Sequence, residues 1–214
     1  MPGMKPLDKW LVGLICFGAL FSYHDAQAQP TDALKNKKVL VVYGGWPNHN
    51  PEKFVALLLP WLKQEGALVD TTSSTAIYAN EKYMAAVDLV IQSITMSHFT
   101  QQEELGLTRA VKNGTGIAGC HGGLGDSFRE NTEYQFMVGG QFVSHPGGVI
   151  DYRVHIKNKK DAITKGMSDF NVKTEQYYMH VDPNINVLAT TTFGGQHAPW
   201  IAKSTMPVVW KKYY

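Results

Sequence analysis

The sequence predicts an α/β fold built on a mostly parallel sheet. Two observations lead to this fold class. Residues 38–43 (KVLVVY) form an apolar, β-branched run, which is typical of a strand covered on both faces. Helical and strand patterns then alternate as far as residue 120. Such alternation predicts right-handed βαβ crossovers, with the functional loops at the carboxyl ends of the strands.

The first helix is expected after the Gly-rich loop that follows this strand. Asn50 and Pro51 supply an N-cap and a proline at the first helical position. Apolar residues then recur at three- and four-residue spacing as far as Gly66. Because Pro60 lies inside this stretch, we expect it to bend the helix or to end its regular part early. Residues 68–72 predict the second strand.

The same pattern continues through two further units. Residues 81–86 predict a short helix, and residues 88–92 (DLVIQ) predict a strand. A capping box at residues 100–103 opens a longer helix, which the Asn-Gly pair at residues 113–114 closes. Residues 116–120 predict the next strand. The carboxyl end of this strand is therefore expected to lie at the same sheet edge as the loop after residue 43.

The second half of the chain has a different pattern. Residues 149–156 (VIDYRVHI) alternate like a half-solvated strand, and residues 186–192 and 206–210 predict short strands of antiparallel or mixed pairing. No repeat or linker divides residues 38–214, so we predict one domain there. The sequence stops directly after a strand-like run without a covering helix, and we therefore expect it to be C-terminally incomplete.

Residues 1–28 have the three parts of a secretory signal peptide. A basic start precedes an uncharged stretch at residues 10–21, which is too short to span a membrane, and Ala-Gln-Ala at residues 26–28 is a small-x-small cleavage site. We expect cleavage there, with residues 29–37 as a polar lead-in and the mature protein exported to the periplasm or the cell exterior, without a stable membrane span. An uncleaved anchor is the alternative.

Composition narrows the range of partners. Lys plus Arg at 20 against Asp plus Glu at 18 gives a formal net charge of +2, which is too small for a nucleic-acid-binding or membrane-surface protein. The oligomeric state is not indicated. Cys16 falls in the signal peptide, so Cys120 is the only thiol expected in the mature chain and no internal disulfide is possible.

The segment at residues 119–123 (GCHGG) has the form of an elbow between a strand and a helix. In such an elbow glycines flank a strained central residue, whose side chain points out at the sheet edge. The central residue is His121. Cys120 precedes it by one position, so strand alternation predicts that its side chain is a small apolar group buried in the helix layer. A nucleophilic Cys120 is the alternative.

Several segments resemble the ThuA-like (trehalose utilisation) family. They occur in order at residues 44–51 (GGWPNHNP), 116–123 (GIAGCHGG), 126–129 (DSFR), 138–147 (VGGQFVSHPG) and 174–178 (TEQYY). The resemblance implies a class I glutamine amidotransferase-like domain over residues 38–214, with a three-layer αβα arrangement, a doubly wound sheet and flavodoxin-like topology. It also implies action on sugars or keto-sugar derivatives. Family members end with a further strand and a Gly-His segment that this sequence lacks.

A histidine at the elbow changes the expected chemistry. Amidotransferases carry a cysteine there, so His121 leaves no thiolate to form a glutamyl thioester, and glutamine hydrolysis is not expected. His121 can be a general acid/base or a metal ligand, and we predict that His145 and Glu175 share its catalytic site. His49, His121 and His145 are the predicted ligands of a divalent metal such as zinc, and Glu175 is expected to add a carboxylate to this cluster. Alternatively, His121 only bonds the loop after the first strand.

A second group of residues is predicted to bind the sugar. Aromatic rings can lie against a sugar face, while polar side chains fix its orientation. The predicted substrate-binding residues are Trp46, His49, Asp126, Arg129, Gln141 and Tyr177. The alternatives are that the aromatic residues pack in the core and that Asp126 and Arg129 pair with each other. We therefore predict an enzyme of hydrolase, lyase or isomerase type, with a non-catalytic carbohydrate-binding module or a thiol-dependent enzyme as alternatives.

Overall fold

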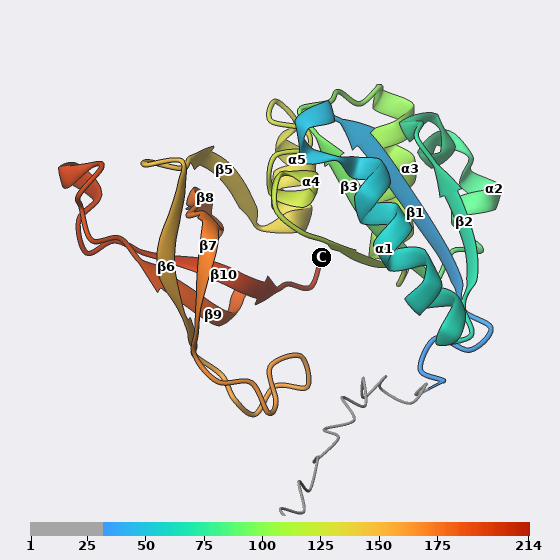
Figure 1. Ribbon diagram of the computed structural model, residues 1–214. Coiled ribbons are helices and arrows are strands. Elements are labelled where there is room, and N and C mark those ends of the chain that lie inside the picture. The colour runs from blue at the N-terminus through green and yellow to red at the C-terminus, as the bar shows by residue number, and fades with distance from the viewer. Residues whose placement is uncertain (1–31) are drawn as a thin grey trace, which may run out of the picture.

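The computed structural model describes residues 32–214, and the predicted signal peptide at residues 1–28 lies outside this range. The first half of the chain forms a parallel sheet in the order β2-β1-β3-β4 (Figure 1). The strands are β1 (Lys38–Gly45), β2 (Leu68–Thr72), β3 (Leu89–Thr95) and β4 (Gly116–Gly119). All four carboxyl ends therefore meet at one edge of the sheet.

Helices lie against both faces of this sheet. Successive residues of β1 point to opposite faces, and each face has its own apolar core. On one face α1 (Pro51–Gln64) packs through Val55 and Leu62. On the other, α2 (Glu81–Met84) and α3 (Gln101–Lys112) cover the sheet, with Leu107 fully buried. This double covering explains why β1 is a continuous apolar run.

The helix ends agree only in part with the sequence signals. The capping box of α3 is present, since the Thr100 hydroxyl accepts from the Glu103 backbone and the Glu103 carboxylate accepts from the Thr100 backbone. Asn50 occupies the N-cap of α1, but it has φ of 48° and its side chain makes no capping bond. Pro60 does not end α1, which continues to Gln64.

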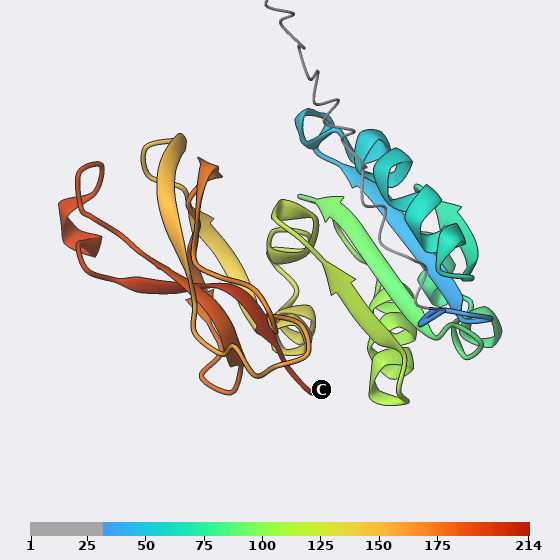
Figure 2. The same ribbon diagram turned by 60° about the horizontal axis from the view of Figure 1, so that its bottom comes forward.

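The second half of the chain forms separate antiparallel sheets. The order β10-β9-β6-β7 joins β6 (Val149–Ile156), β7 (Phe170–Glu175), β9 (Asn186–Thr192) and β10 (Thr205–Lys211), and a smaller sheet pairs β5 (Gly140–Ser144) with β8 (Tyr178–Val181). Figure 2 shows these sheets beside the parallel one. The strands predicted at residues 149–156, 186–192 and 206–210 are confirmed. β5, β7 and β8 were not predicted.

Short helices complete the described chain. They are α4 (Gly122–Gly125), α5 (Thr132–Val138) and the 3-10 turns η1 (Pro47–His49), η2 (Thr75–Ala79) and η3 (Pro199–Ile201). The prediction of an α/β protein with a parallel sheet is thus confirmed. A three-layer, doubly wound sheet through the whole domain is not confirmed, because only β1 to β4 are parallel.

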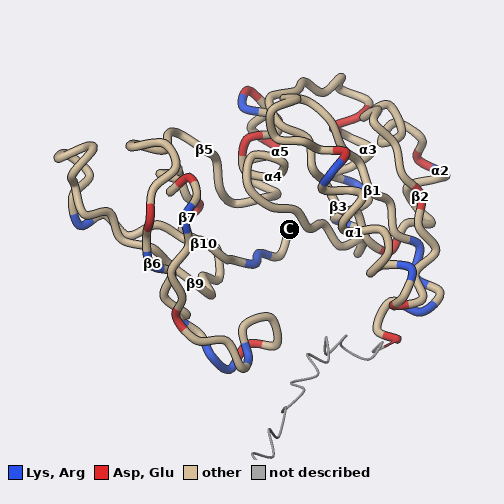
Figure 3. Tube along the Cα trace, in the orientation of Figure 1, with Lys and Arg blue, Asp and Glu red and all other residues tan. Residues whose placement is uncertain are grey.

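Charged residues of both signs are spread along the described chain. Figure 3 shows Lys and Arg interspersed with Asp and Glu along both halves of the described chain. Within residues 32–214, no helix has both the length and the apolar character that a membrane span requires.

Gly106 lies where α3 crosses η2, and this crossing requires glycine. A Cβ atom at residue 106 would lie 1.8 Å from the carbonyl oxygen of Tyr78. Alanine favours a helix by about 1 kcal/mol over glycine, yet we expect Gly106→Ala to destabilise the protein by about 1 to 3 kcal/mol through overpacking. Urea unfolding measures the change. Gln102→Ala, at an exposed position of the same helix, is the control, and equal stability of the two variants would contradict the prediction.

Candidate functional site

His121 stands at a strained bend between β4 and α4. Its backbone has φ of 56° and ψ of −146°, a region that residues other than glycine seldom adopt. The glycines on either side allow the chain to approach β3 closely. A Cβ atom at Gly119 would lie 2.5 Å from the Gln92 carbonyl oxygen, and one at Gly123 would lie 2.7 Å from the Ser93 Cα. The bend therefore holds His121 at the carboxyl edge of the parallel sheet.

Both ring nitrogens of His121 have partners from the antiparallel half of the chain. Nε2 lies 3.0 Å from a carboxylate oxygen of Glu175, at the end of β7, and Nδ1 lies 3.0 Å from the Tyr177 hydroxyl. Because a carboxylate can only accept, Nε2 carries the proton and Nδ1 accepts from the Tyr177 O–H. The geometry thus assigns the tautomer of the neutral ring.

His49 lies beside His121 on the loop that follows β1. The two rings meet edge to face with centroids 4.8 Å apart, and His49 Nδ1 is 2.9 Å from the Thr95 hydroxyl. Gly122 makes this approach possible, since a Cβ atom there would lie 2.7 Å from the His49 ring. Thr95 was not predicted, because the third strand was expected to end at residue 92, whereas β3 continues to Thr95. The β-branched residues Ile94 and Thr95 were the available signal.

Burial controls the protonation of this cluster. Desolvation lowers the pKa of His121, and the neighbouring His49 lowers it further, against the opposing effect of Glu175. His121 is therefore a neutral imidazole near pH 7. Desolvation and the Glu175 charge raise the pKa of Tyr177, so its hydroxyl stays protonated and can donate to His121. Both shifts agree with the tautomer assigned from the distances.

His145, in the turn after β5, approaches the same carboxylate from another side. Its Nε2 lies 3.6 Å from the second oxygen of Glu175, a separation too long for a hydrogen bond. Among the described residues, its buried Nδ1 has no hydrogen-bond partner. Its ring lies near those of Phe142 and Tyr177, with centroids 5.7 and 6.3 Å away. The structure therefore brings the predicted catalytic residues His121, His145 and Glu175 together.

The fold brings together only some of the residues that were predicted to bind a metal. One ligand-type atom each of His49, His121 and Glu175 lie within 4.8 Å of one another. Glu175, the carboxylate expected in the predicted cluster, belongs to this compact set, whereas the predicted ligand His145 does not. A carboxylate with two imidazoles is a ligand combination found at catalytic zinc sites.

Asp126 and Arg129 pair with each other, as expected if they do not bind the sugar. Two guanidinium nitrogens lie 2.5 and 2.7 Å from the two oxygens of the buried Asp126 carboxylate. The Arg129 guanidinium lies over the Phe142 ring at 5.6 Å. The pair therefore supports the Phe142 ring, which packs with Tyr177 beside His121. Half of the Arg129 side chain remains exposed.

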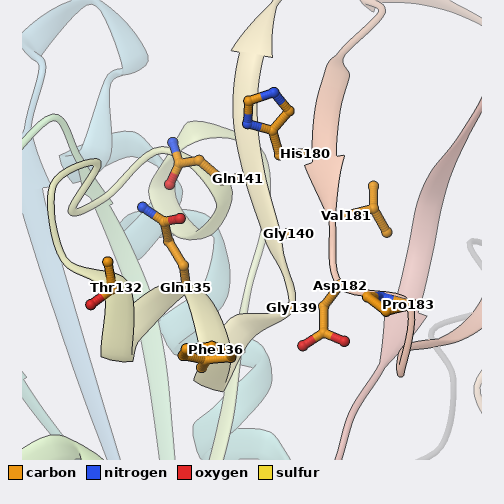
Figure 4. Close-up of a pocket in the computed structure, with 10 residues that line it drawn as sticks. All are labelled: Thr132, Gln135, Phe136, Gly139, Gly140, Gln141, His180, Val181, Asp182 and Pro183. Atoms are coloured by element: carbon orange, nitrogen blue, oxygen red, sulfur yellow. The ribbon is translucent and has the colours of Figure 1, made fainter.

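The other predicted substrate-binding residues are more dispersed. Tyr177 contacts His121 directly. Trp46 is 44% exposed and its backbone N–H donates to Thr95. Gln141 lies in a different pocket from His121, a hollow of about 460 Å³ between α5, β5 and β8 (Figure 4). Its side-chain amide donates to the Phe142 carbonyl.

The prediction that Cys120 is buried in the helix layer is wrong. Cys120 is exposed and lines a pocket of about 470 Å³, together with Leu124 and Trp210. The physical reason is that β4 is the last strand of the parallel sheet, so no further strand flanks the residue that follows it. Partial desolvation raises the pKa of the Cys120 thiol, which disfavours the thiolate. His121 also lines this pocket.

Comparisons with known proteins agree with the resemblance in sequence. A ThuA-like protein from Bacteroides uniformis superposes with a TM-score of 0.70 at 17% identity, covering 85% of this chain and 79% of that one. A second, from Parabacteroides merdae, has a TM-score of 0.65 at 16% identity, with 84% and 76% covered. The cytoplasmic protein STM1381 from Salmonella typhimurium has a TM-score of 0.52 at 13% identity, with 71% and 78% covered.

At these identities the likeness shows a shared fold only. No curated protein matches the sequence significantly. The model of the ThuA family, described as trehalose utilisation, matches residues 38–214. The chain therefore belongs to the ThuA family.

Proposed function

We propose that this protein is an exported enzyme that acts on a carbohydrate or a keto-sugar derivative at the centre around His121 and Glu175. The observation that carries the proposal is the contact of the elbow imidazole with a carboxylate, a tyrosine hydroxyl and a second imidazole, all from distant parts of the chain. The proposal of export rests on the signal-like pattern at residues 1–28.

The centre has the groups that sugar chemistry requires. Cleavage or rearrangement of a sugar needs a proton moved to or from an oxygen or an adjacent carbon, and imidazoles exchange protons near neutral pH. His121 shares its Nε2 proton with the Glu175 carboxylate, so this pair can take part in proton transfer. His145 lies beside the free oxygen of Glu175, and we assign it the transfer of the proton. Glu175 orients the His121 ring, and its second oxygen lies 3.6 Å from His145 Nε2.

A wall of aromatic rings adjoins these groups and can receive the apolar face of a sugar ring. The Phe142 and Tyr177 rings lie 4.5 Å apart, and Tyr177 and His121 lie 4.6 Å apart. The half-exposed Arg129 guanidinium lies over the Phe142 ring at 5.6 Å, where it can bond sugar hydroxyl groups. This arrangement supports a carbohydrate as the substrate class.

The same geometry disfavours glutamine amidotransferase chemistry. The side chain at the bend is an imidazole, and the adjacent Cys120 thiol has a raised pKa. A thioester-forming enzyme needs the opposite, a thiolate favoured by its surroundings.

The proposal predicts turnover that depends on Glu175. Trehalose, other disaccharides and their keto derivatives are incubated with the protein, and the products are measured by mass spectrometry. We expect Glu175→Gln to lower kcat by about 10² to 10⁴-fold, because the carboxylate that orients His121 and faces His145 loses its charge. His155→Ala, which removes a histidine paired with Asp169 outside the site, is expected to leave kcat unchanged.

A non-catalytic carbohydrate-binding module is the second candidate, favoured by the aromatic wall. It predicts sugar binding in calorimetry without products, weakened by Tyr177→Ala and unaffected by His145→Ala. That result would contradict the enzyme proposal.

A further inference from the structure

We infer that His49, His121 and Glu175 form a binding site for one divalent transition-metal ion of the zinc class. The inference deepens the proposed function, on which it rests only in placing the ion at the same centre. Three observations support it: the spacing of the three donor atoms, the hydroxyl groups that contact the two imidazoles, and the charges around the site.

The donor atoms are close to the spacing that such an ion needs. Zinc binds imidazole nitrogen and carboxylate oxygen at about 2.0 to 2.2 Å, so ligand atoms around a tetrahedral ion lie about 3.4 Å apart. His121 Nε2 and Glu175 Oε2 are 3.0 Å apart, and the three donors lie within 4.8 Å of one another. A shortening of the widest separation by about 1 to 1.5 Å, within reach of side-chain rotation, completes the set.

In each imidazole, the nitrogen that would not bind the ion already contacts a hydroxyl group. His49 Nδ1 contacts the buried Thr95 hydroxyl at 2.9 Å, which leaves Nε2 for the ion. His121 Nδ1 contacts the Tyr177 hydroxyl at 3.0 Å, which again leaves Nε2. Such partners orient metal-binding histidines in proteins. A hydroxyl can donate or accept, so both contacts persist when the ring proton moves from Nε2 to Nδ1.

The charges around the site also fit a cation. Two imidazoles that coordinate through their lone pairs and one carboxylate together supply a single negative charge, and three protein ligands leave a coordination position for substrate or water. An ion held there supplies a Lewis acid, which can polarise the carbonyl oxygen of a keto sugar. His145, near the second oxygen of Glu175, remains free to transfer protons.

A second histidine–carboxylate pair in the molecule provides a matched control. His155 Nδ1 lies 3.0 Å from Asp169, a pair as close as His121 and Glu175. The third group at that position is the Arg153 guanidinium, 3.5 Å from the same carboxylate, and a cation there excludes a metal ion. His155→Ala therefore removes an imidazole of similar exposure without touching the inferred site.

The test is titration of the metal-free full chain with Co²⁺, followed by visible absorption and by calorimetry. We expect one equivalent to bind, with absorption bands of a four-coordinate site. His49→Ala and Glu175→Gln should each weaken binding by at least about 100-fold, while His155→Ala binds as the wild type does. Lack of stoichiometric binding, or equal weakening by His155→Ala, would overturn the inference. Circular dichroism of each variant confirms folding.

Two milder variants keep the test decisive if a ligand variant fails to fold. Thr95→Val and Tyr177→Phe remove only the hydroxyls behind the rings, and we expect each to weaken Co²⁺ binding by about 10 to 100-fold. Unchanged affinity in both would overturn the site. Sugar turnover that persists without metal binding refutes the inference alone, whereas metal binding without sugar turnover or sugar binding refutes the proposed function alone.

Discussion

His121→Ala is expected to lower kcat on the proposed sugar substrate by at least about 100-fold, because it removes the ring that joins Glu175, Tyr177 and His49. We expect only a small change in stability, since the ring is 37% exposed and its hydrogen-bond partners can turn to water. Steady-state kinetics and thermal unfolding measure the two effects. Activity close to that of the wild type would remove His121 from the mechanism.

A glycine variant separates the role of the side chain from that of the bend. His121 has a positive φ, which costs a non-glycine residue about 1 to 2 kcal/mol. His121→Gly should therefore be as inactive as His121→Ala, yet more stable than it by about 1 kcal/mol, after allowance for the greater unfolded-state entropy of glycine. Because both variants lack the imidazole, its contribution to stability cancels in the difference between them. An alanine variant at least as stable as the glycine variant would contradict a strained bend.

Gln92→Leu is expected to destabilise the protein by about 2 to 5 kcal/mol. The Gln92 side chain is fully buried and accepts from the Tyr78 hydroxyl at 3.0 Å. Its amide contacts the Tyr134 and Ser127 hydroxyls at 2.6 and 3.0 Å. Leucine leaves the buried Tyr78 hydroxyl without its acceptor, which costs about 1 to 3 kcal/mol beyond the bonds themselves. Denaturant unfolding monitored by circular dichroism gives the free energy.

Removal of both partners provides the control for this network. In the double variant Gln92→Leu with Tyr78→Phe no tyrosine hydroxyl is stranded, so we expect it to be more stable than the sum of the two single changes implies. Strictly additive free energies would show that the bond between residues 78 and 92 contributes nothing. Because Ser127 and Tyr134 also bond the carbonyl oxygens of α4, the same network supports the helix that follows His121.

Local patterns were sufficient to predict most of the first half of the fold. The apolar run of β1, the capping box of α3 and the Gly-rich bend at residues 119–123 depend on neighbours within a few residues. Patterns of this kind are present in the sequence itself. The α/β class, the parallel strands and a histidine at the bend followed from them.

The second half was harder to predict because its strands are short and half exposed. β7 and β8 have few buried residues, and β-structure of this kind depends on cross-strand partners more than on intrinsic preference. Cys120 is an informative error. Strand alternation predicted that its side chain points into the helix layer. A side chain is buried only where neighbouring elements cover it, and β4 is an edge strand with a partner strand on one side only.

The sequence by itself determined the family, the class of fold and the identity of the side chain at the bend, since each depends on contiguous residues. The sequence also predicted that His49, His145 and Glu175 lie near that side chain, but only the tertiary structure decided which of their atoms meet. Glu175 completes the set with His49 and His121, Thr95 and Tyr177 hold the two rings, and Gln141 lies in another pocket. The contacts of Glu175 and Tyr177 with His121 join the antiparallel half to the parallel half, and such long-range contacts depend on how the sheets pack and not on spacing along the chain.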